Sequence, residues 1–229
     1  MKLIALETSG RIGSLALADD GRAVAEAEIT TGMRHGRDLL PALDEATRQA
    51  GWQAEDIGLV AVSIGPGSFT GLRIAVMFAR TFCWRTGART LAVPTLRVIA
   101  DGAPADAREV AVITDAQRGG VYWSRYTRAA DGALVRASAE AVAPPEEVAG
   151  QLPPGALLMG DGLKRYGPLL AGRPQADESL WQPRAATVAR LGWAIHLRGE
   201  HTPAELLEPL YVRRPAPEEV LERRRRGGR

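Results

Sequence analysis

The order of predicted strands and helices repeats once along the chain, and this repeat constrains the fold more than any single motif does. In the first half, the pattern predicts strands at 2–6, 13–18, 23–29, 59–64 and 90–93 and helices at 38–51, 72–87 and 96–100. The second half repeats this series with strands at 110–114, 121–126, 134–142 and 156–159 and helices at 145–152 and 163–170. Hairpins followed by alternating helices and strands predict two α/β units with mixed sheets.

A linker-like segment at 102–108 separates the two series and sets the expected boundaries. We expect an N-terminal lobe at residues 1–102, a C-terminal lobe at 103–212 and a basic tail at 213–229. A further amphipathic helix predicted at 187–198 belongs to the C-terminal lobe by this division.

This duplicated plan is similar to that of the actin-like ATPases and sugar kinases, in which two lobes clasp a nucleotide between facing hairpin turns. The fold class that we expect is therefore α/β, an actin-like duplicated fold with ribonuclease H-like lobes. The facing turns of this chain would be 7–10, with Glu7 and Thr8, and 115–119, which begins with Asp115. One hypothesis for the function is an independent ATP-dependent transferase or kinase that uses these residues and the glycine turns.

A glycine-rich stretch, GPGSFTGLRIA at residues 65–75, links a predicted strand to the helix after it. Backbone N–H groups that converge at a helix N-terminus can bind an anion, so a phosphate or nucleotide site is one interpretation. A structural turn is the other, because the G-x-G-x-x-x-G spacing differs from the dinucleotide fingerprint and no Lys-Ser or Lys-Thr pair completes a P-loop. The candidate nucleotide or anion residues are Thr8, Gly65, Gly67, Ser68 and Gly71.

The helix after this stretch is apolar on nearly every side from Leu72 to Trp84. Such a helix has to be covered on more than one face, either within its own core or by another protein. Arg73 and Arg80 lie two turns apart on one face and would frame an interface. The preceding helix adds an apolar stripe with Leu39, Leu40 and Leu43.

Composition and charge indicate the cellular location of the protein and the partners that it can bind. Its 229 residues are 45% hydrophobic, and no apolar run reaches the ~20 residues that a membrane-spanning helix needs. We expect a cytoplasmic protein with no membrane contact, and the single Cys83 excludes a disulfide framework.

The positive charge of the chain is concentrated in its tail. Residues 213–229 hold seven Arg and three Glu, whereas the whole chain has a formal net charge of only +2, so the net charge of the remaining residues is about −2. The tail is either a solvated basic end or a contact for RNA or an acidic partner.

Several separated stretches resemble one family, the bacterial TsaB (YeaZ) proteins of tRNA threonylcarbamoyladenosine biosynthesis. The most specific of them is GPGSFTGLRI at residues 65–74. Weaker matches follow the family's order: ETS at 7–9 with SLAL at 14–17, His35 with LLP at 39–41, DA at 115–116 with 119–123, and EPLYVR at 208–213. Together they span nearly the whole chain, and the family has the actin-like fold.

The resemblance implies a non-catalytic subunit that forms a heterodimer with TsaD, the subunit that transfers the threonylcarbamoyl group to the adenosine beside the tRNA anticodon. It also implies TsaE in a larger complex, a homodimer when the chain is alone, and contact with tRNA through the complex. This chain would then require no cofactor, and ATP or ADP would bind only at the complex interface.

The resemblance also implies that the first two helices of this chain pack against those of TsaD as a four-helix bundle. The residues of this partner interface would be His35, Arg37, Leu39, Leu40, Leu43, Arg73, Val76, Met77, Arg80 and Trp84. On this interpretation, Val76→Glu or Leu40→Glu abolishes co-purification with TsaD and leaves the free subunit folded.

Metal binding and catalysis are not expected of this chain. In TsaD-like proteins a His-x-x-x-His pair on the first helix binds a metal, because residues one turn apart share a face. Here His35 has Leu39 in the partner position. Two departures from the family, Glu7 for the usual Asp and Gly36 after the histidine, further weaken the case for ATP hydrolysis and leave the start of the first helix open. A third hypothesis, a peptidase, lacks a Cys/His or zinc-binding arrangement in the sequence.

Overall fold

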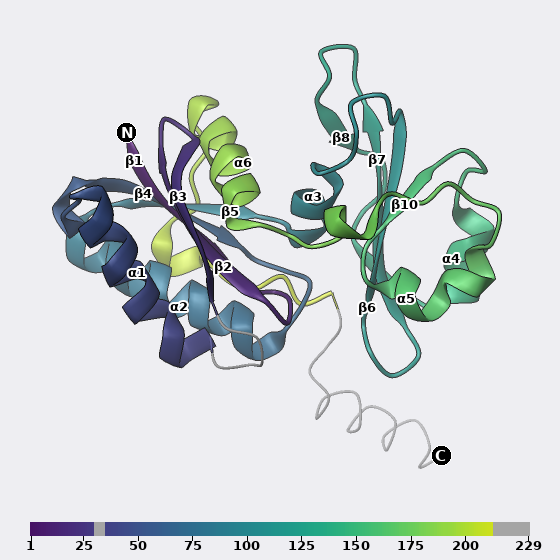
Figure 1. Ribbon diagram of the computed structural model, residues 1–229, viewed down its shortest axis with the longest axis horizontal. Coiled ribbons are helices and arrows are strands. Elements are labelled where there is room, and N and C mark those ends of the chain that lie inside the picture. The colour runs from purple at the N-terminus through teal and green to yellow at the C-terminus, as the bar shows by residue number, and fades with distance from the viewer. Residues whose placement is uncertain (30–34, 213–229) are drawn as a thin grey trace.

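Two five-stranded sheets organise the structure, a computed structural model that describes residues 1–29 and 35–212 (Figure 1). The first sheet has the order β3-β2-β1-β4-β5, in which β2 is antiparallel to β1 and β3, while β4 and β5 run parallel to β1. These strands confirm the predicted ones: β1 (Lys2–Glu7), β2 (Gly13–Asp19), β3 (Arg22–Ile29), β4 (Ile57–Ser63) and β5 (Arg89–Val93).

Three helices cover the two faces of the first sheet. α1 (His35–Ala50) and α2 (Phe69–Thr86) lie side by side on one face, and α6 (Ala185–Leu197) lies on the other (Figure 1). Strand β1 contributes to both cores, since Ile4 and Leu6 pack on the α1/α2 side while Leu3 and Ala5 pack on the α6 side. A strand covered on both faces is nearly all apolar, which explains its sequence.

The first helix begins earlier than the sequence suggested. α1 starts at His35, and Asp38, the predicted N-cap, lies in its first turn. The carboxylate there still lies near the positive end of the helix dipole. The helix ends at Ala50, one residue before the predicted end, and the following Gly51 has a φ of 67°, a backbone conformation that favours glycine.

The second sheet has the order β10-β6-β7-β8, and β9 also pairs with β7. Its strands are β6 (Glu109–Asp115), β7 (Val121–Arg128), β8 (Leu134–Arg136), β9 (Ala141–Ala143) and β10 (Leu157–Met159). The predicted single strand at 134–142 is wrong, because β8 and β9 pair with opposite ends of β7 and the chain leaves the ladder between them. In this gap the N–H groups of Ala137 and Ser138 both donate to the Arg125 carbonyl.

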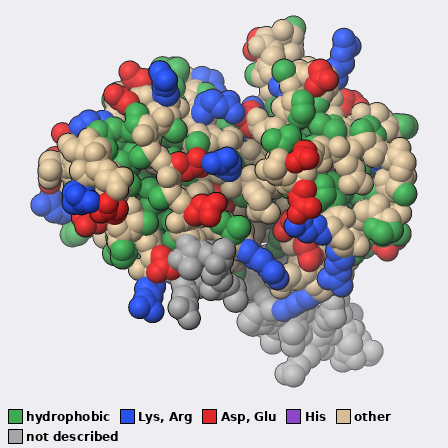
Figure 2. Space-filling model, in the orientation of Figure 1, with side chains coloured by type: hydrophobic (Ala, Val, Ile, Leu, Met, Phe, Trp, Pro, Cys, Tyr) green, Lys and Arg blue, Asp and Glu red, His purple; other side chains and the backbone are tan. Residues whose placement is uncertain are grey.

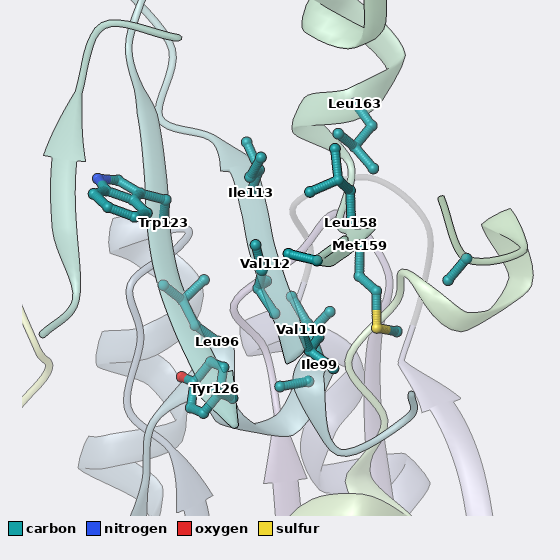
Figure 3. Close-up of a cluster of buried hydrophobic side chains, with 14 of the residues drawn as sticks. Leu96, Ile99, Val110, Val112, Ile113, Trp123, Tyr126, Leu158, Met159 and Leu163 are labelled. Carbon is teal, nitrogen blue, oxygen red and sulfur yellow. The ribbon is translucent and has the colours of Figure 1, made fainter. Parts of the chain in front are cut away.

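Short helices cover the second sheet. α3 (Thr95–Ala100) connects the lobes and lies on the side toward the first lobe, whereas α4 (Pro145–Gln151) and α5 (Gly162–Tyr166) lie on the far side (Figure 1). The predicted helix at 163–170 is split into α5 and a 3₁₀ turn at Gly167–Leu170. Figure 3 shows the core between these layers, with Leu96 of α3, Val112 of β6, Tyr126 of β7 and Leu163 of α5.

The chain returns to the first lobe after the second lobe is complete. α6 packs against all five strands of the first sheet, and Ala185, Val188 and Ala189 join its core. The predicted C-terminal lobe at 103–212 is therefore wrong for its last part. An amphipathic pattern shows that a helix has a buried face, but it does not show which sheet covers that face.

The segment after α6 also belongs to the first lobe. Thr202 pairs with Thr90 at the edge of β5, and Leu207 is completely buried on the α1/α2 side of the sheet. Farther on, the Leu210 N–H donates to the Ile64 carbonyl at 2.7 Å. The predicted tail, residues 213–229, lies outside the described residues. Within residues 1–29 and 35–212, none of the helices combines the length and the apolar character that a membrane crossing requires.

Candidate functional site

The glycine-rich turn between β4 and α2 packs directly onto the turn that follows β1. The Ser68 N–H donates to the Ser9 carbonyl at 2.7 Å, and the Thr8 hydroxyl donates to the Gly71 carbonyl at 2.8 Å. Only a glycine fits at Gly67, because a Cβ there would lie 2.5 Å from the Ser9 carbonyl oxygen. The structure thus brings the candidate turn residues together.

Several polar groups of this turn have partners within the chain. The Ser68 hydroxyl caps α2 by accepting the Gly71 N–H at 3.2 Å. Gly65 has a φ of 109°, its N–H donates to the Thr95 hydroxyl at 3.0 Å, and its carbonyl accepts the Thr95 N–H at 2.8 Å. These contacts favour the structural interpretation of the turn, and the nucleotide or anion site stays a prediction.

Glu7, at the end of β1, is completely buried. Its Oε1 accepts the Ser9 N–H at 2.6 Å and the Ser9 hydroxyl at 2.5 Å, whereas Oε2 has no hydrogen-bond partner among the described residues. Burial raises the pKa of the Glu7 carboxyl, and the Ser63 and Ser9 hydroxyls offset part of that effect. The Ser63 hydroxyl is also 2.6 Å from the Thr95 hydroxyl, and either of the two can be the donor in that hydrogen bond. Mg²⁺ prefers charged oxygen donors, so a raised pKa makes the Glu7 carboxyl a weaker ligand for that ion.

The facing turn of the second lobe is built on Asp115, at the end of β6. Its Oδ1 accepts the Gln117 N–H at 2.8 Å, and its own N–H donates to Asp161 Oδ1 at 3.1 Å. Burial raises the pKa of Asp161, while the Asp115 N–H, Lys164 and Arg11 lower it in part. Because Arg11 belongs to the hairpin turn of the first lobe, the two turns lie within electrostatic reach of each other.

A stripe runs along the outward face of α2, where residues at successive turns point away from the sheet. It consists of Arg73, Met77 and Trp84, which are exposed, and Arg80, which is half-buried. Trp84 is 86% exposed and Met77 is 57% exposed, although both side chains are large and apolar. On the neighbouring helix Leu40 is 60% exposed, and Arg37 is exposed as well. We refer to this stripe together with Leu40 and Arg37 as the α1/α2 surface.

Three of the predicted interface residues lie in the core instead. Leu39 is 2% exposed and Val76 is 3% exposed, and with Leu43 they pack between the two helices and the first sheet. The prediction that Val76→Glu leaves the subunit folded is therefore wrong, because the carboxylate would be buried without a partner. His35 begins α1, but its side chain lies outside the described residues.

Sequence reasoning misses Phe69 and Tyr211, which extend the α1/α2 surface at the start of α2. Their ring centroids are 5.4 Å apart, and Arg73 lies over the Phe69 ring at 3.8 Å while its Nε donates to the Tyr211 hydroxyl at 3.0 Å. These contacts hold the chain around Tyr211 against the first turns of α2. The sequence carries one signal for these two residues. Phe69 and Tyr211 belong to the stretches at 65–74 and 208–213 that resemble one family.

Residues 1–29 and 35–212 contain no group of three or more His, Cys, Asp or Glu side chains that suits a metal ion. Cys83 is buried in α2, and burial raises the pKa of its thiol to about 12. A thiol in that state is a weak nucleophile.

The strand order of the first sheet, with helices on both faces and a shortened repeat in the second lobe, defines an actin-like protein and confirms the predicted fold class. Residues 29–176 match the model of the TsaD family, tRNA N6-adenosine threonylcarbamoyltransferase. The tRNA threonylcarbamoyladenosine biosynthesis protein TsaB of Escherichia coli (strain K12) is 30% identical over 220 residues, which are 93% of this chain and 95% of that protein. The chain belongs to the TsaB family.

Two solved structures from Pseudomonas aeruginosa agree with this assignment. YeaZ superposes with a TM-score of 0.82 at 33% identity and covers 92% of this chain and 99% of its own. An uncharacterised protein described as similar to peptidase YeaZ superposes with a TM-score of 0.81 at 32% identity, covering 93% of this chain and 99% of its own. The likeness therefore extends over both lobes.

Proposed function

We propose that this chain is a non-catalytic subunit that binds a TsaD-type transferase through the α1/α2 surface and supports threonylcarbamoyl transfer to tRNA. Membership of the TsaB family supports a role in tRNA threonylcarbamoyladenosine biosynthesis. The observation that carries the partner interface is the exposure of Trp84, Met77 and Leu40 on two adjacent helices.

Exposed apolar side chains gathered on one surface indicate a contact with another protein. Aromatic and arginine side chains also supply most of the energy of protein interfaces, and Trp84 lies on the same stripe as Arg73 and Arg80. The α1/α2 surface therefore has the composition of an interface core with a polar rim.

We also propose further partners for this chain. In the absence of the transferase, the same surface pairs with a second copy of the chain, and TsaE joins the larger complex. ATP or ADP binds only at a subunit boundary, and the cytoplasm is the location that a tRNA substrate implies.

Contact with tRNA is made through the complex. Basic and acidic side chains are interspersed over the face seen in Figure 2, and the chain apart from its tail has a slightly negative formal charge. A body of this kind lacks the concentrated positive charge that binds the phosphate backbone.

The experiment that tests the interface is co-purification of the untagged chain with tagged TsaD of the same organism. Met77→Glu and Trp84→Glu each abolish capture, because a carboxylate would be buried in the contact. Val135→Glu is the matched control. The exposed fraction of Val135, 55%, is similar to the 57% of Met77, but Val135 lies on β8 of the second lobe. Normal capture of both α2 variants overturns the proposed interface.

A quantitative form of the same test uses Trp84→Ala, which removes the aromatic anchor without adding a charge. We expect the Kd for TsaD to rise by about 30-fold, which corresponds to an interface anchor worth about 2 kcal/mol. Isothermal titration calorimetry measures this change, and Leu169→Ala, an exposed apolar residue of the second lobe, should leave the Kd unchanged.

The catalytic hypothesis has its own test. The isolated chain is titrated with ATP and Mg²⁺ and then assayed for ATP turnover. Saturable turnover by the isolated chain that Asp115→Asn abolishes would make it an enzyme in its own right and overturn the non-catalytic role.

A further inference from the structure

Arg73 is held in one position at the end of the α1/α2 surface. Its guanidinium carbon lies 3.8 Å from the centre of the Phe69 ring, which covers one face of the guanidinium plane. Its Nε donates to the Tyr211 hydroxyl at 3.0 Å, and the Tyr211 ring packs on Phe69 with centroids 5.4 Å apart. One face and one N–H group of the guanidinium group therefore have partners within the chain.

The backbone anchors both aromatic residues that hold Arg73. Phe69 is the first residue of α2. One residue before Tyr211, the Leu210 N–H donates to the carbonyl of Ile64, which directly follows β4 of the first sheet. A side chain that is already ordered loses less rotamer entropy when a partner binds it. Arg73 is therefore arranged for binding before any partner arrives.

The end of the guanidinium group that carries Nη1 and Nη2 is free to bind an anion. Within residues 1–29 and 35–212, these two nitrogens of Arg73 have no hydrogen-bond or ion-pair partner. Arg73 is exposed, and the neighbouring Tyr211 is 40% exposed, so a binding partner can reach this end. Two parallel N–H groups at the end of a guanidinium plane match the two oxygens of a carboxylate.

The helix that carries Arg73 has no carboxylate of its own. α2 contains Arg73, Arg80 and Arg85 and neither Asp nor Glu. Its outward stripe is otherwise apolar, with Met77 and Trp84 exposed. Electrostatic complementarity across an interface pairs a positive group on one protein with a negative group on the other. A partner that covers this stripe therefore fits best if it presents an acidic side chain beside apolar ones.

We propose that Arg73 is the receptor for one carboxylate, the side chain of an Asp or Glu of the protein that binds the α1/α2 surface. The inference rests on the proposed function for the identity of that protein. Nη1 and Nη2 of Arg73 donate to the two carboxylate oxygens, while Phe69 and Tyr211 are positioning residues that hold the guanidinium group. A phosphate of RNA accepts the same donors, but the apolar side chains of Phe69 and Met77 on the same stripe favour a protein.

The test measures the Kd of the full, untagged chain for TsaD of the same organism by calorimetry. Arg73→Lys keeps the positive charge but loses the planar pair of donors, and should weaken binding by at least about tenfold. Tyr211→Phe keeps the ring packing and removes only the hydroxyl that holds Nε, so it should weaken binding less, by about threefold. The matched control is Arg85→Lys, the same change on α2 about 100° around the helix from Trp84, which should leave the Kd unchanged.

Two further measurements separate a binding role of Arg73 from a structural one. Each of the three variants should melt within about 2 °C of the parent. Among replacements of Asp by Asn and of Glu by Gln in TsaD, one should weaken binding as strongly as Arg73→Lys does. Combining that replacement with Arg73→Lys should add little further loss, because the two residues of a contact are coupled.

The outcomes distinguish this receptor from the interface that contains it. If Arg73→Lys binds as the parent does while Met77→Glu fails to bind, the receptor is overturned and the α1/α2 interface stands. Normal binding by both variants overturns both. A loss of affinity that comes with a lower melting temperature, additive losses for every acidic residue of TsaD, or tRNA binding by the isolated chain that Arg73→Lys weakens would also overturn the receptor.

Discussion

The two lobes share one order of strands and helices but differ in the length of nearly every element. β4 has seven residues and α2 has 18, whereas their counterparts β10 and α5 have three and five. At 1.5 Å per residue α2 is about 27 Å long, and it presents an outward stripe as well as a buried one. The helices of the second lobe are too short to present an extended outward face. The greater length of the first-lobe helices therefore accounts for the α1/α2 surface.

The acidic residue at the end of the first strand also differs between the lobes. Glu7 is completely buried with one oxygen unpartnered, whereas Asp115 is partly exposed and bonded within its own turn. Equivalent positions in the two lobes thus have different surroundings. A chemical role assigned to one of these carboxyl groups therefore does not apply to the other on the ground of its position alone.

The largest expected effect separates the inward face of α2 from its outward face. Val76→Glu should lower the free energy of unfolding by about 3–5 kcal/mol, because it places an unpaired charge in the core of the first lobe. Met77→Glu, one residue along the helix, should change it by no more than about 0.5 kcal/mol. Urea denaturation followed by circular dichroism measures both values, and similar losses for the two variants would contradict the assigned faces.

The next effect tests whether the glycine turns of the two lobes are equivalent. A Cβ at Gly67 would meet the Ser9 carbonyl oxygen at 2.5 Å, and one at Gly160 would meet the Ile113 carbonyl oxygen at 2.3 Å. Because backbone atoms cannot move aside, Gly67→Ala and Gly160→Ala should each cost about 1–3 kcal/mol in unfolding free energy. Gly160→Ala should cost more, since the φ of Gly160 is 108°.

The control for these turns is Gly155→Ala, where a Cβ would enter open space. Its unfolding free energy should stay within about 0.5 kcal/mol of the parent value. A neutral outcome for Gly160→Ala would show that the turn of the second lobe is looser than that of the first.

The smallest effect concerns Glu7 and the dependence of stability on pH. The unfolded carboxyl ionises near its ordinary pKa of 4.5, whereas burial raises the pKa in the folded protein. Between these two pKa values the folded state holds more protons, so stability falls as the pH rises through this window. Glu7→Gln cannot ionise, so it should remove that fall and stabilise the protein at pH 8 by about 1 kcal/mol.

Unfolding curves recorded between pH 4 and pH 8 measure this difference. The comparison variant is Asp115→Asn, which changes an ion pair with Arg165 at 3.9 Å on the surface and should alter stability by less than about 1 kcal/mol. Parallel pH profiles for the parent and Glu7→Gln would contradict a raised pKa of the buried Glu7 carboxyl.

The sequence predicted the first lobe well and the second lobe less well, for physical reasons. Long apolar strands and an 18-residue helix give a clear pattern, so β1 to β5 and α2 lie close to their predicted bounds. Strands of three residues carry almost no pattern, which is why β8 and β9 merged into one prediction. The position of α6 depends on contacts with strands far away in the sequence, and no local signal encodes that distance.

The candidate interface was predicted in part. Leu40, Met77 and Trp84 are exposed as an interface requires, whereas Leu39, Leu43 and Val76 are not. An all-apolar helix does not show directly which side faces its sheet. Met77 and Trp84 follow Arg73 and Arg80 by one turn each and share their face. Val76 lies three residues after Arg73 and four before Arg80, so the spacing does not separate it from that face, and only the packing shows that it is buried. The unpartnered oxygen of Glu7 depends on tertiary packing and has no signature in the sequence.

The return of the chain to the first lobe has a consequence for synthesis on the ribosome. The first sheet is translated early, but one of its faces stays uncovered until α6 emerges, and its other core lacks Leu207 until still later. The second lobe, by contrast, is translated as one uninterrupted segment and can fold while synthesis continues. The first lobe therefore begins first and is completed last, so a chain truncated before residue 185 would expose a bare apolar sheet to chaperones and proteases.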